Sequence, residues 1–232
     1  EAGDIGREDR KALIHQTKSS WLQTLSSLDH EEDDPGTTWN ADCREREPNH
    51  MAPRQAWRAI QDGLPKGAII SSDIGNNCAV GNAYPIFEEG RKYLAPGLFG
   101  PCGYGFPAIM GAKIGNPDMP VIGFAGDGAF GISMNEMTSI GRVEWPAITM
   151  IVFRNYQWGA EKRNTILWYH DNFVGTELNP GLSYAKVAEG CGLKGVQVTT
   201  QLELTQALKD ACQAQKNGIT TFIEVILNQE LG

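Results

Sequence analysis

Residues 120–159 read PVIGFAGDGAFGISMNEMTSIGRVEWPAITMIVFRNYQWG, and this stretch decides the fold. Its apolar run at 121–125 is typical of a buried parallel strand, and a second apolar run follows at 147–153. The apolar residues between the two runs have helical spacing, which predicts a connecting helix. Asp127 follows the first strand and Asn155 the second. Because ligands bind at the carboxyl ends of the strands in an open α/β sheet, we expect both side chains at that edge.

The chemistry of Asp127 and Asn155 is that of a site for a hard metal ion. Carboxylate and amide oxygens suit Mg²⁺ or Ca²⁺, and Mg²⁺ commonly completes its shell with phosphates and water. Gly126 and Gly128 let the backbone approach a diphosphate, and the N-terminus of the next helix adds N–H donors. Residues 126–131 also fit the GxGxxG pattern of dinucleotide sites, or simple turn glycines. A dinucleotide site needs an acidic residue at the end of the next strand, where this chain has Arg154-Asn155.

Gly126-Asp127-Gly128, followed after the 26 residues 129–154 by Asn155, resembles the cofactor motif of thiamine-diphosphate-dependent enzymes. The resemblance implies thiamine diphosphate and Mg²⁺ as cofactors, with side-chain oxygens of Asp127 and Asn155 and the backbone carbonyl of Gln157 on the metal. The family commonly has Asn-Asn where this chain has Arg154-Asn155. The candidate cofactor-binding residues are Gly75, Asn76, Asn77, Gly100, Cys102, Gly126, Asp127, Gly128, Ala129, Asn155, Gln157, Trp158 and Gly159.

Two further loops contribute to this candidate set. Gly75 and Asn76 follow the expected strand at 68–72 and either reach the diphosphate or, for the Asn, cap a helix. Four glycines within 97–105 demand unusual backbone geometry or close approach to a ligand. In the family, the matching loop holds the aminopyrimidine ring, which implies a carbonyl contact from Gly100 and an apolar wedge from Cys102. Relatives usually have Met at the wedge, and the alternative of a reactive Cys102 thiol lacks a nearby His in the sequence.

The string 155–162, NYQWGAEK, is similar to that of the sulfoacetaldehyde acetyltransferases within this family. This narrower resemblance implies two anionic substrates, sulfoacetaldehyde and phosphate, which are converted to acetyl phosphate and sulfite in taurine degradation. The cofactor would act as the electron sink. Arg154, Lys162 and Arg163 either attract these anions or pair with nearby carboxylates. The alternatives are an acetolactate-synthase-like carboligase, a 2-oxoacid decarboxylase and a non-catalytic part that only mediates assembly.

The whole pattern predicts an α/β fold with a mostly parallel six-stranded sheet and helices on both faces. The expected strands lie at 68–72, 92–95, 121–125, 147–153, 195–198 and 220–226. The resemblance identifies residues 51–232 as a pyrophosphate-type domain of the thiamine-diphosphate-binding fold. Residues 1–50 are expected to be the end of a preceding domain and a linker, because an amphipathic segment at 7–28 precedes the acidic run 29–36.

Composition narrows the functional classes further. The 232 residues are 41% hydrophobic and 21% charged, and the net charge of −8 with a pI near 5.0 disfavours nucleic acid as a partner. The five cysteines are odd in number and lack a CxxC spacing, which favours reduced thiols in the cytoplasm over disulfides or zinc. No apolar run approaches the roughly 20 residues of a membrane span, so no membrane partner is expected.

No catalytic side chain is certain from the sequence. The family activates its cofactor with a glutamate from a different domain, usually of a partner subunit, so this chain alone is expected to be inactive. The complete enzyme is expected to be a homodimer or tetramer, and the chain is either part of a longer one or a separate subunit. His170 lies in an aromatic-rich segment, 160–180, which is expected to be a loop over the site. It is either an acid–base group or a packed surface residue.

Overall fold

The computed structural model describes residues 50–83, 92–169 and 173–229. Its centre is one six-stranded sheet in which all strand pairs are parallel, with the order β2-β1-β3-β4-β6-β5. The strands are β1 (Ile69–Ser72), β2 (Lys92–Leu94), β3 (Val121–Gly126), β4 (Thr149–Arg154), β5 (Lys194–Val198) and β6 (Thr221–Ile226). The predicted α/β class and the six-stranded sheet are therefore confirmed.

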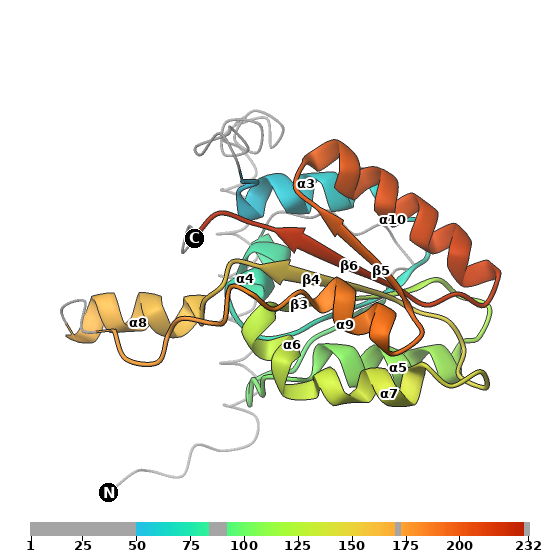
Figure 1. Cartoon of the computed structure of the whole chain (residues 1–232), viewed down its shortest axis with the longest axis horizontal. Helices are drawn as coiled ribbons and strands as arrows, with labels where there is room; N and C mark the ends of the chain where they lie inside the picture. Colours follow the sequence, from blue (N-terminus) through green and yellow to red (C-terminus); the bar gives the residue numbers. More distant parts are fainter. Residues whose placement is uncertain (1–49, 84–91, 170–172, 230–232) are drawn as a thin grey trace, which may run out of the picture. The chain divides into compact units, whose positions relative to one another are not determined.

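Helices cover both faces of this sheet (Figure 1). One face carries α3 (Pro53–Gly63), α4 (Asn76–Ala83) and α10 (Gln201–Lys216). The other face carries α5 (Gly105–Gly115), α6 (Asp127–Ser133), the 3-10 turn η1 (Met134–Glu136), α7 (Met137–Ile140) and α9 (Tyr184–Gly190). The remaining described helix, α8 (Gly159–Tyr169), extends away from the sheet. None of the helices in the described part of the chain is long and apolar enough to cross a membrane.

Local sequence signals account for the helix ends. Pro53 opens α3, where its fixed φ suits the first turn and its missing N–H costs nothing. α10 begins with a capping box, because the Thr200 side chain accepts a bond from Glu203 N–H and the Glu203 carboxylate bonds back to Thr200 N–H. Its buried face includes Leu204 and Leu208, as the helical spacing predicts.

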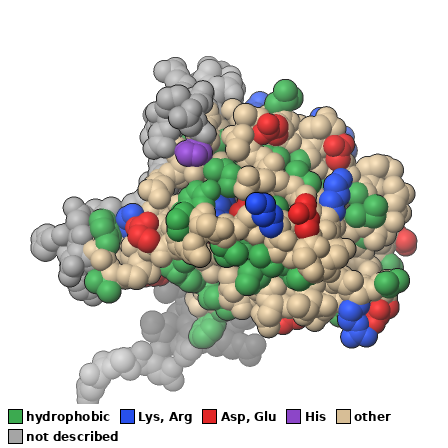
Figure 2. All heavy atoms as spheres, in the orientation of Figure 1, with side chains coloured by type: hydrophobic (Ala, Val, Ile, Leu, Met, Phe, Trp, Pro, Cys, Tyr) green, Lys and Arg blue, Asp and Glu red, His purple; other side chains and the backbone are tan. Residues whose placement is uncertain are grey.

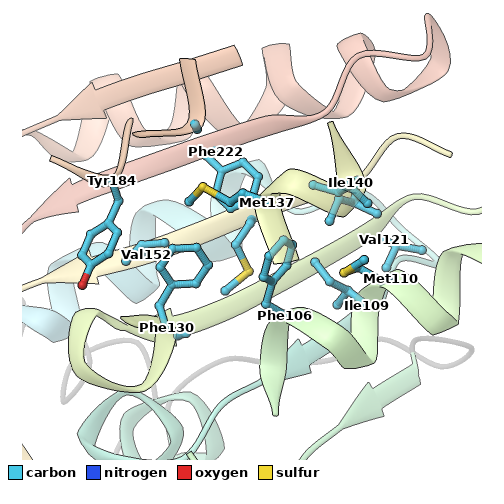
Figure 3. Packing of buried hydrophobic residues seen from close by; sticks show 14 of the residues in the cluster. Phe106, Ile109, Met110, Val121, Phe130, Met137, Ile140, Val152, Tyr184 and Phe222 are labelled. Atoms are coloured by element: carbon cyan, nitrogen blue, oxygen red, sulfur yellow. The ribbon is translucent and has the colours of Figure 1, made fainter. Parts of the chain in front are cut away.

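Aromatic side chains fill the layer between the sheet and α5, α6 and α9 (Figure 3). Phe106, Phe130 and Phe222 are almost fully buried, and their ring centroids lie 5.3–5.7 Å from one another. Tyr184 packs edge-on against Phe130 at 5.1 Å and marks the end of the cluster nearest the carboxyl edge of the sheet. On the opposite face of the sheet, Trp57 of α3 packs on Phe124 at 4.8 Å.

Three segments differ from the sequence-based prediction. The helical pattern after β3 is broken into α6, η1 and α7, and α6 begins at Asp127 itself. The prediction of a loop over 160–180 is wrong for residues 160–169, which belong to α8 (Gly159–Tyr169). The aromatic residues suggested a loop, but Ala160, Glu161 and Lys162 are good helix formers at the start of that segment. The predicted helix at 7–28, the linker and His170 lie outside the described residues.

Charged side chains on the face seen in Figure 2 are mixed in sign, with Lys and Arg lying among Asp and Glu. No one-sign patch gathers there.

Candidate functional site

The carboxyl ends of β1, β3 and β4 and the loops that follow them form one cleft. Its volume is about 890 Å³ when the open mouth is included. Twelve of the predicted residues line it: Gly75, Asn76, Gly100, Cys102, Gly126, Asp127, Gly128, Ala129, Asn155, Gln157, Trp158 and Gly159. The thirteenth, Asn77, belongs to α4, and its side chain is outside the described set.

Sequence reasoning missed several cleft residues. They are Pro53, Trp57, Ile74, Phe153, Ala160, Glu161 and Leu227. Ile74, Phe153 and Ala160 adjoin candidates in the sequence, so their position was a detectable signal. Trp57 and Leu227 reach the cleft only through the tertiary fold, and nothing in their local sequence indicates it.

Three oxygen-bearing groups converge at the centre of the cleft. The Asn155 side-chain amide faces Asp127 Oδ1 and the backbone carbonyl of Gln157. When its nitrogen points toward them, it donates hydrogen bonds of 3.3 Å to Asp127 Oδ1 and 3.1 Å to the Gln157 oxygen. When its oxygen points toward them, three acceptors meet without a donor, an arrangement that a bound cation would stabilise.

The spacing of these three groups fits Mg²⁺. Neighbouring ligands of an octahedral Mg²⁺, each about 2.0–2.1 Å from the ion, stand roughly 2.9 Å apart. The separations of 3.1 and 3.3 Å from the Asn155 amide atom are close to that value. The donor set of one carboxylate, one amide and one carbonyl is also the hard-oxygen set that Mg²⁺ prefers. In contrast, no cluster of three His, Cys, Asp or Glu side chains occurs among residues 50–83, 92–169 and 173–229.

Asp127 is a buried carboxylate whose two oxygens have different partners. Oδ2 accepts a bond of 2.9 Å from Arg154 Nη1 and one of 2.7 Å from Tyr156 N–H. Oδ1 accepts one of 3.0 Å from Gly128 N–H and faces Asn155. Burial raises the pKa of Asp127, whereas the Tyr156 N–H and the Arg154 guanidinium act against that rise by stabilising the carboxylate.

Tyr156 determines the shape of the loop that carries Asn155 and Gln157. It is the one non-glycine residue with a positive φ in the described part of the chain, at 63°. Such a left-handed residue turns the chain sharply between Asn155 and Gln157. The strand-like segment 176–178 holds the turn, since Trp158 N–H donates to Thr176 O at 2.7 Å and Leu178 N–H to Tyr156 O at 2.8 Å. The side chain of Asn155 and the carbonyl of Gln157 therefore meet on the same side.

The glycine-rich loop is fixed by Asp73, a fully buried residue at the end of β1. Its Oδ2 accepts a 2.6 Å bond from Gly105 N–H, and its Oδ1 accepts bonds from Gly103 N–H at 3.1 Å and Ile74 N–H at 2.9 Å. Gly103 has φ 86° and Gly100 has φ 58°, so both glycines use backbone conformations that other residues rarely adopt. Asp73 was not a predicted site residue, although its place at a strand end was a signal.

Cys102 is exposed at the cleft. Partial burial, followed by the negative charges of Asp73 and Glu161, raises the pKa of its thiol. A thiol held in its protonated form is a poor nucleophile. This environment disfavours the reactive-thiol alternative, and the wedge role of Cys102 stays a prediction.

Arg154, Lys162 and Arg163, the side chains that were candidates for attracting anionic substrates, differ in their surroundings. Arg154 is fully buried and pairs with Asp127, which is the carboxylate-pairing alternative, and its effect on anionic substrates stays a prediction. Lys162 Nζ lies 2.6 Å from Glu177 Oε1 and 3.1 Å from Gln157 Oε1, which makes it a part of the loop scaffold. Arg163 is exposed on α8, and its role stays a prediction.

Fold and site together fit one class of protein, the parallel α/β domains that bind a ligand at the carboxyl ends of their strands. Residues 73–225 match the family described as "Thiamine pyrophosphate enzyme, C-terminal TPP binding domain". The match covers more than half of the chain, and the chain belongs to this family. It is a thiamine-diphosphate-binding domain, as the motif predicts.

Individual relatives agree with this assignment. The chain is 76% identical over 231 residues to a "Probable sulfoacetaldehyde acetyltransferase" of Rhizobium meliloti (strain 1021), covering 100% of this chain and 39% of that protein. It is 70% identical to a "Sulfoacetaldehyde acetyltransferase" of Roseovarius nubinhibens, covering 100% of this chain and 38% of that protein. The chain thus spans less than half the length of these curated relatives.

A solved structure shares the fold. It is the thiamine diphosphate-dependent 4-hydroxybenzoylformate decarboxylase of Rhodococcus jostii RHA1, with a TM-score of 0.72 and 26% identity. The similarity covers 81% of this chain and 34% of the decarboxylase chain.

Proposed function

We propose that this chain is the cofactor-anchoring part of an acetyltransferase that converts sulfoacetaldehyde and phosphate to acetyl phosphate and sulfite. The observation that carries the proposal is the high identity of the whole chain to relatives named sulfoacetaldehyde acetyltransferase. The site residues 155–162 lie within that similarity. Thiamine diphosphate, when bound, supplies the carbanion and electron-sink chemistry of the reaction.

The residues of this chain bind and orient that cofactor. Asp127 Oδ1, the Asn155 amide oxygen and the Gln157 carbonyl would hold Mg²⁺, and the ion would neutralise part of the diphosphate charge. Gly128 and Ala129 lie in the first turn of α6 and line the cleft. Because Gly128 N–H already donates to Asp127 Oδ1, the N–H of Ala129 is the one of the two that would be left for the diphosphate. Gly100 and Cys102 lie across the cleft on the glycine-rich loop, which is where the aminopyrimidine contact and the wedge are assigned.

The larger organisation follows from the same proposal. Residues 51–232 form the cofactor-binding domain, and residues 1–50 are the end of a preceding domain and its linker. The complete enzyme is a cytoplasmic homodimer or tetramer. Light scattering on the purified full-length protein gives the oligomeric state, and a monomeric active enzyme contradicts this part.

A substrate assay tests the reaction. The full-length protein is supplied with Mg²⁺, thiamine diphosphate, sulfoacetaldehyde and phosphate, and sulfite and acetyl phosphate are measured. We expect both products in equal amounts and little consumption of pyruvate in a parallel sample. Pyruvate consumption without sulfite release identifies the carboligase or decarboxylase alternative and overturns the proposal.

Removal of the metal or of its ligand tests the role of the site. EDTA is expected to abolish thiamine-diphosphate binding, and added Mg²⁺ to restore it, because diphosphate and carboxylate repel each other without the cation. Asp127→Ala is expected to lose this metal-dependent binding, as measured by calorimetry. Metal-independent binding by Asp127→Ala contradicts the assigned site.

A further inference from the structure

Arg154 is a buried cation placed directly behind the metal site. It is the last residue of β4, its side chain is 0% exposed, and Asn155 follows it in the chain. Nη1 donates a 2.9 Å hydrogen bond to Asp127 Oδ2. Nη2 donates to the backbone carbonyls of Asn179 and Leu182, the latter at 3.2 Å. Arg154 therefore links the carboxylate at the end of β3 to the segment that precedes α9.

Two aromatic rings and a second carboxylate enclose the guanidinium of Arg154. The rings of Tyr156 and Tyr184 lie 4.3 and 5.3 Å from its central carbon. Nε lies 3.7 Å from Glu224 Oε1, and Glu224 is itself held by Ser183 Oγ at 2.6 Å and Gln197 Nε2 at 3.2 Å. A rigid planar donor that reaches a carboxylate and two carbonyls at once is a geometry that lysine cannot reproduce.

This arrangement decides how Asp127 presents itself to a metal. Oδ2 already accepts two hydrogen bonds, from Arg154 and from Tyr156 N–H, which use both of its lone pairs. Oδ1 accepts one, from Gly128 N–H, and faces the Asn155 amide atom and the Gln157 carbonyl. Only one oxygen of the carboxylate is thus available to an ion at the cluster.

We propose that Arg154 is a positioning residue that makes Asp127 a one-oxygen ligand and thereby biases the site toward Mg²⁺ and against Ca²⁺. The inference rests on the metal role assigned under the proposed function. Mg²⁺ needs near-octahedral contacts from single oxygens. In contrast, Ca²⁺ takes about 6–8 oxygen ligands and gains from carboxylates that bind through both oxygens. With Oδ2 occupied by Arg154, the bidentate contact is blocked.

The test compares the two ions on the full-length protein. Calorimetry with thiamine diphosphate present gives the Kd of Mg²⁺ and of Ca²⁺ for the wild type and for Arg154→Gln. Both ions carry the same charge, so loss of the guanidinium charge changes the two affinities alike and cancels in their ratio. We expect Kd(Ca²⁺)/Kd(Mg²⁺) to exceed one in the wild type and to fall about tenfold in Arg154→Gln, the usual size of an effect from a residue behind a metal ligand.

Arg142→Gln is the matched control. Arg142 is an exposed arginine paired with Glu144, remote from the cleft, and its replacement is expected to leave the ratio unchanged. A wild-type ratio in Arg154→Gln overturns the inference, as does a wild type without preference between the ions. If neither ion supports cofactor binding to the wild type, the metal assignment itself fails, and the inference fails with it.

A structural measurement covers the case in which Arg154→Gln does not fold. In a crystal structure of the wild-type protein with Mg²⁺ and thiamine diphosphate, Asp127 is expected to contact the ion through Oδ1 alone, with Oδ2 still on Arg154. Contact through both oxygens, or through Oδ2, overturns the inference without any variant.

Discussion

Gly128 lacks a side chain because the indole of Trp158 occupies the space. A Cβ at residue 128 would lie 2.8–3.0 Å from three ring atoms of Trp158, closer than real Cβ atoms come. We expect Gly128→Ala to displace Trp158 from the cleft wall and to destabilise the fold by about 1–3 kcal/mol, the usual cost of overpacking. Urea unfolding gives the change in free energy, and calorimetry gives the expected loss of cofactor affinity.

Gly111→Ala serves as the control for this change. Gly111 lies inside α5, and a Cβ there meets nothing within 4 Å. It is expected to raise the free energy of unfolding by roughly 0.5–1 kcal/mol, because alanine restricts the unfolded chain. If Gly128→Ala behaves like Gly111→Ala, the tight contact with Trp158 is not what keeps residue 128 a glycine.

Cys102 is expected to react slowly although it is exposed. Burial of its sulfur and the charges of Asp73 and Glu161 hold the pKa of the thiol above its ordinary value. A smaller fraction is then thiolate at neutral pH, so alkylation is slower than for an ordinary cysteine of pKa about 8.5. Alkylation of the Cys102 peptide, followed by mass spectrometry against pH, should show a midpoint above that value.

Glu161→Gln tests the cause. Removal of one negative charge near the sulfur lowers the pKa of Cys102, so its alkylation at neutral pH should become faster. A midpoint at or below about 8.5 in the wild type contradicts the environment described here and reopens the reactive-thiol alternative.

At the scale of elements, Asp73 connects β1 to the loop that carries Gly100 and Cys102. Asn at residue 73 has one acceptor oxygen for three N–H donors and turns an N–H group toward one of them. We expect Asp73→Asn to loosen residues 100–105 at a cost of about 1–3 kcal/mol. Hydrogen exchange at the amides of Gly103 and Gly105 should become faster, and cofactor affinity should fall.

Asp62→Asn is the control for the Asp73 variant. Asp62 is exposed on α3 and lies 3.7 Å from Arg58, one turn earlier. Surface pairs of this kind contribute little, about 0–1 kcal/mol. Equal exchange rates at Gly103 and Gly105 in the wild type and Asp73→Asn would show that the loop holds its shape without the carboxylate.

The elements that the sequence predicts well are those with a strong periodic signal. β3 and β4 are apolar runs bounded by glycine or polar residues, and both were expected within two residues of their observed ends. α10 has a capping box and a clear buried face. The helix after β3 was expected as one piece, and its division at η1 leaves no mark in the apolar spacing because Met134, Met137 and Ile140 fit either arrangement.

Only part of the candidate site could be predicted from the sequence. Strand ends of a parallel sheet meet by topology, so the convergence of Asp127 and Asn155 followed from the order of the elements. The left-handed Tyr156 did not follow, because it depends on the pairing of 156–158 with the distant segment 176–178. The burial of Arg154 did not follow either, because its partners Asp127, Leu182 and Glu224 are distant in the sequence. Arginine at a strand end reads as a surface cation until Asp127 and Glu224 are known to flank it.

At the scale of the whole molecule, the cleft lacks a complete set of catalytic groups within the described residues. Its lining carboxylates are Asp127, which faces the metal position, and Glu161, an exposed residue on α8. The family resemblance implies an activating glutamate on another domain, and the chain spans 39% of the Rhizobium meliloti relative. Within the described residues, the cleft therefore offers groups that can anchor the cofactor.

If the activating glutamate comes from another domain, as the family resemblance implies, the 232-residue chain should turn over sulfoacetaldehyde far more slowly than the full-length protein. A positioned acid–base group contributes about 10²–10⁴-fold to rate, so its absence should lower sulfite release at least about 100-fold against the full-length protein. The same preparation should still bind thiamine diphosphate weakly and only with Mg²⁺, since Asp127, Asn155 and Gln157 are present. Sulfite release and calorimetry on equal concentrations of the two proteins check both statements. Turnover by the short chain at the full-length rate would place the activating group within these residues, where Glu161 is the carboxylate that lines the cleft without facing the metal position.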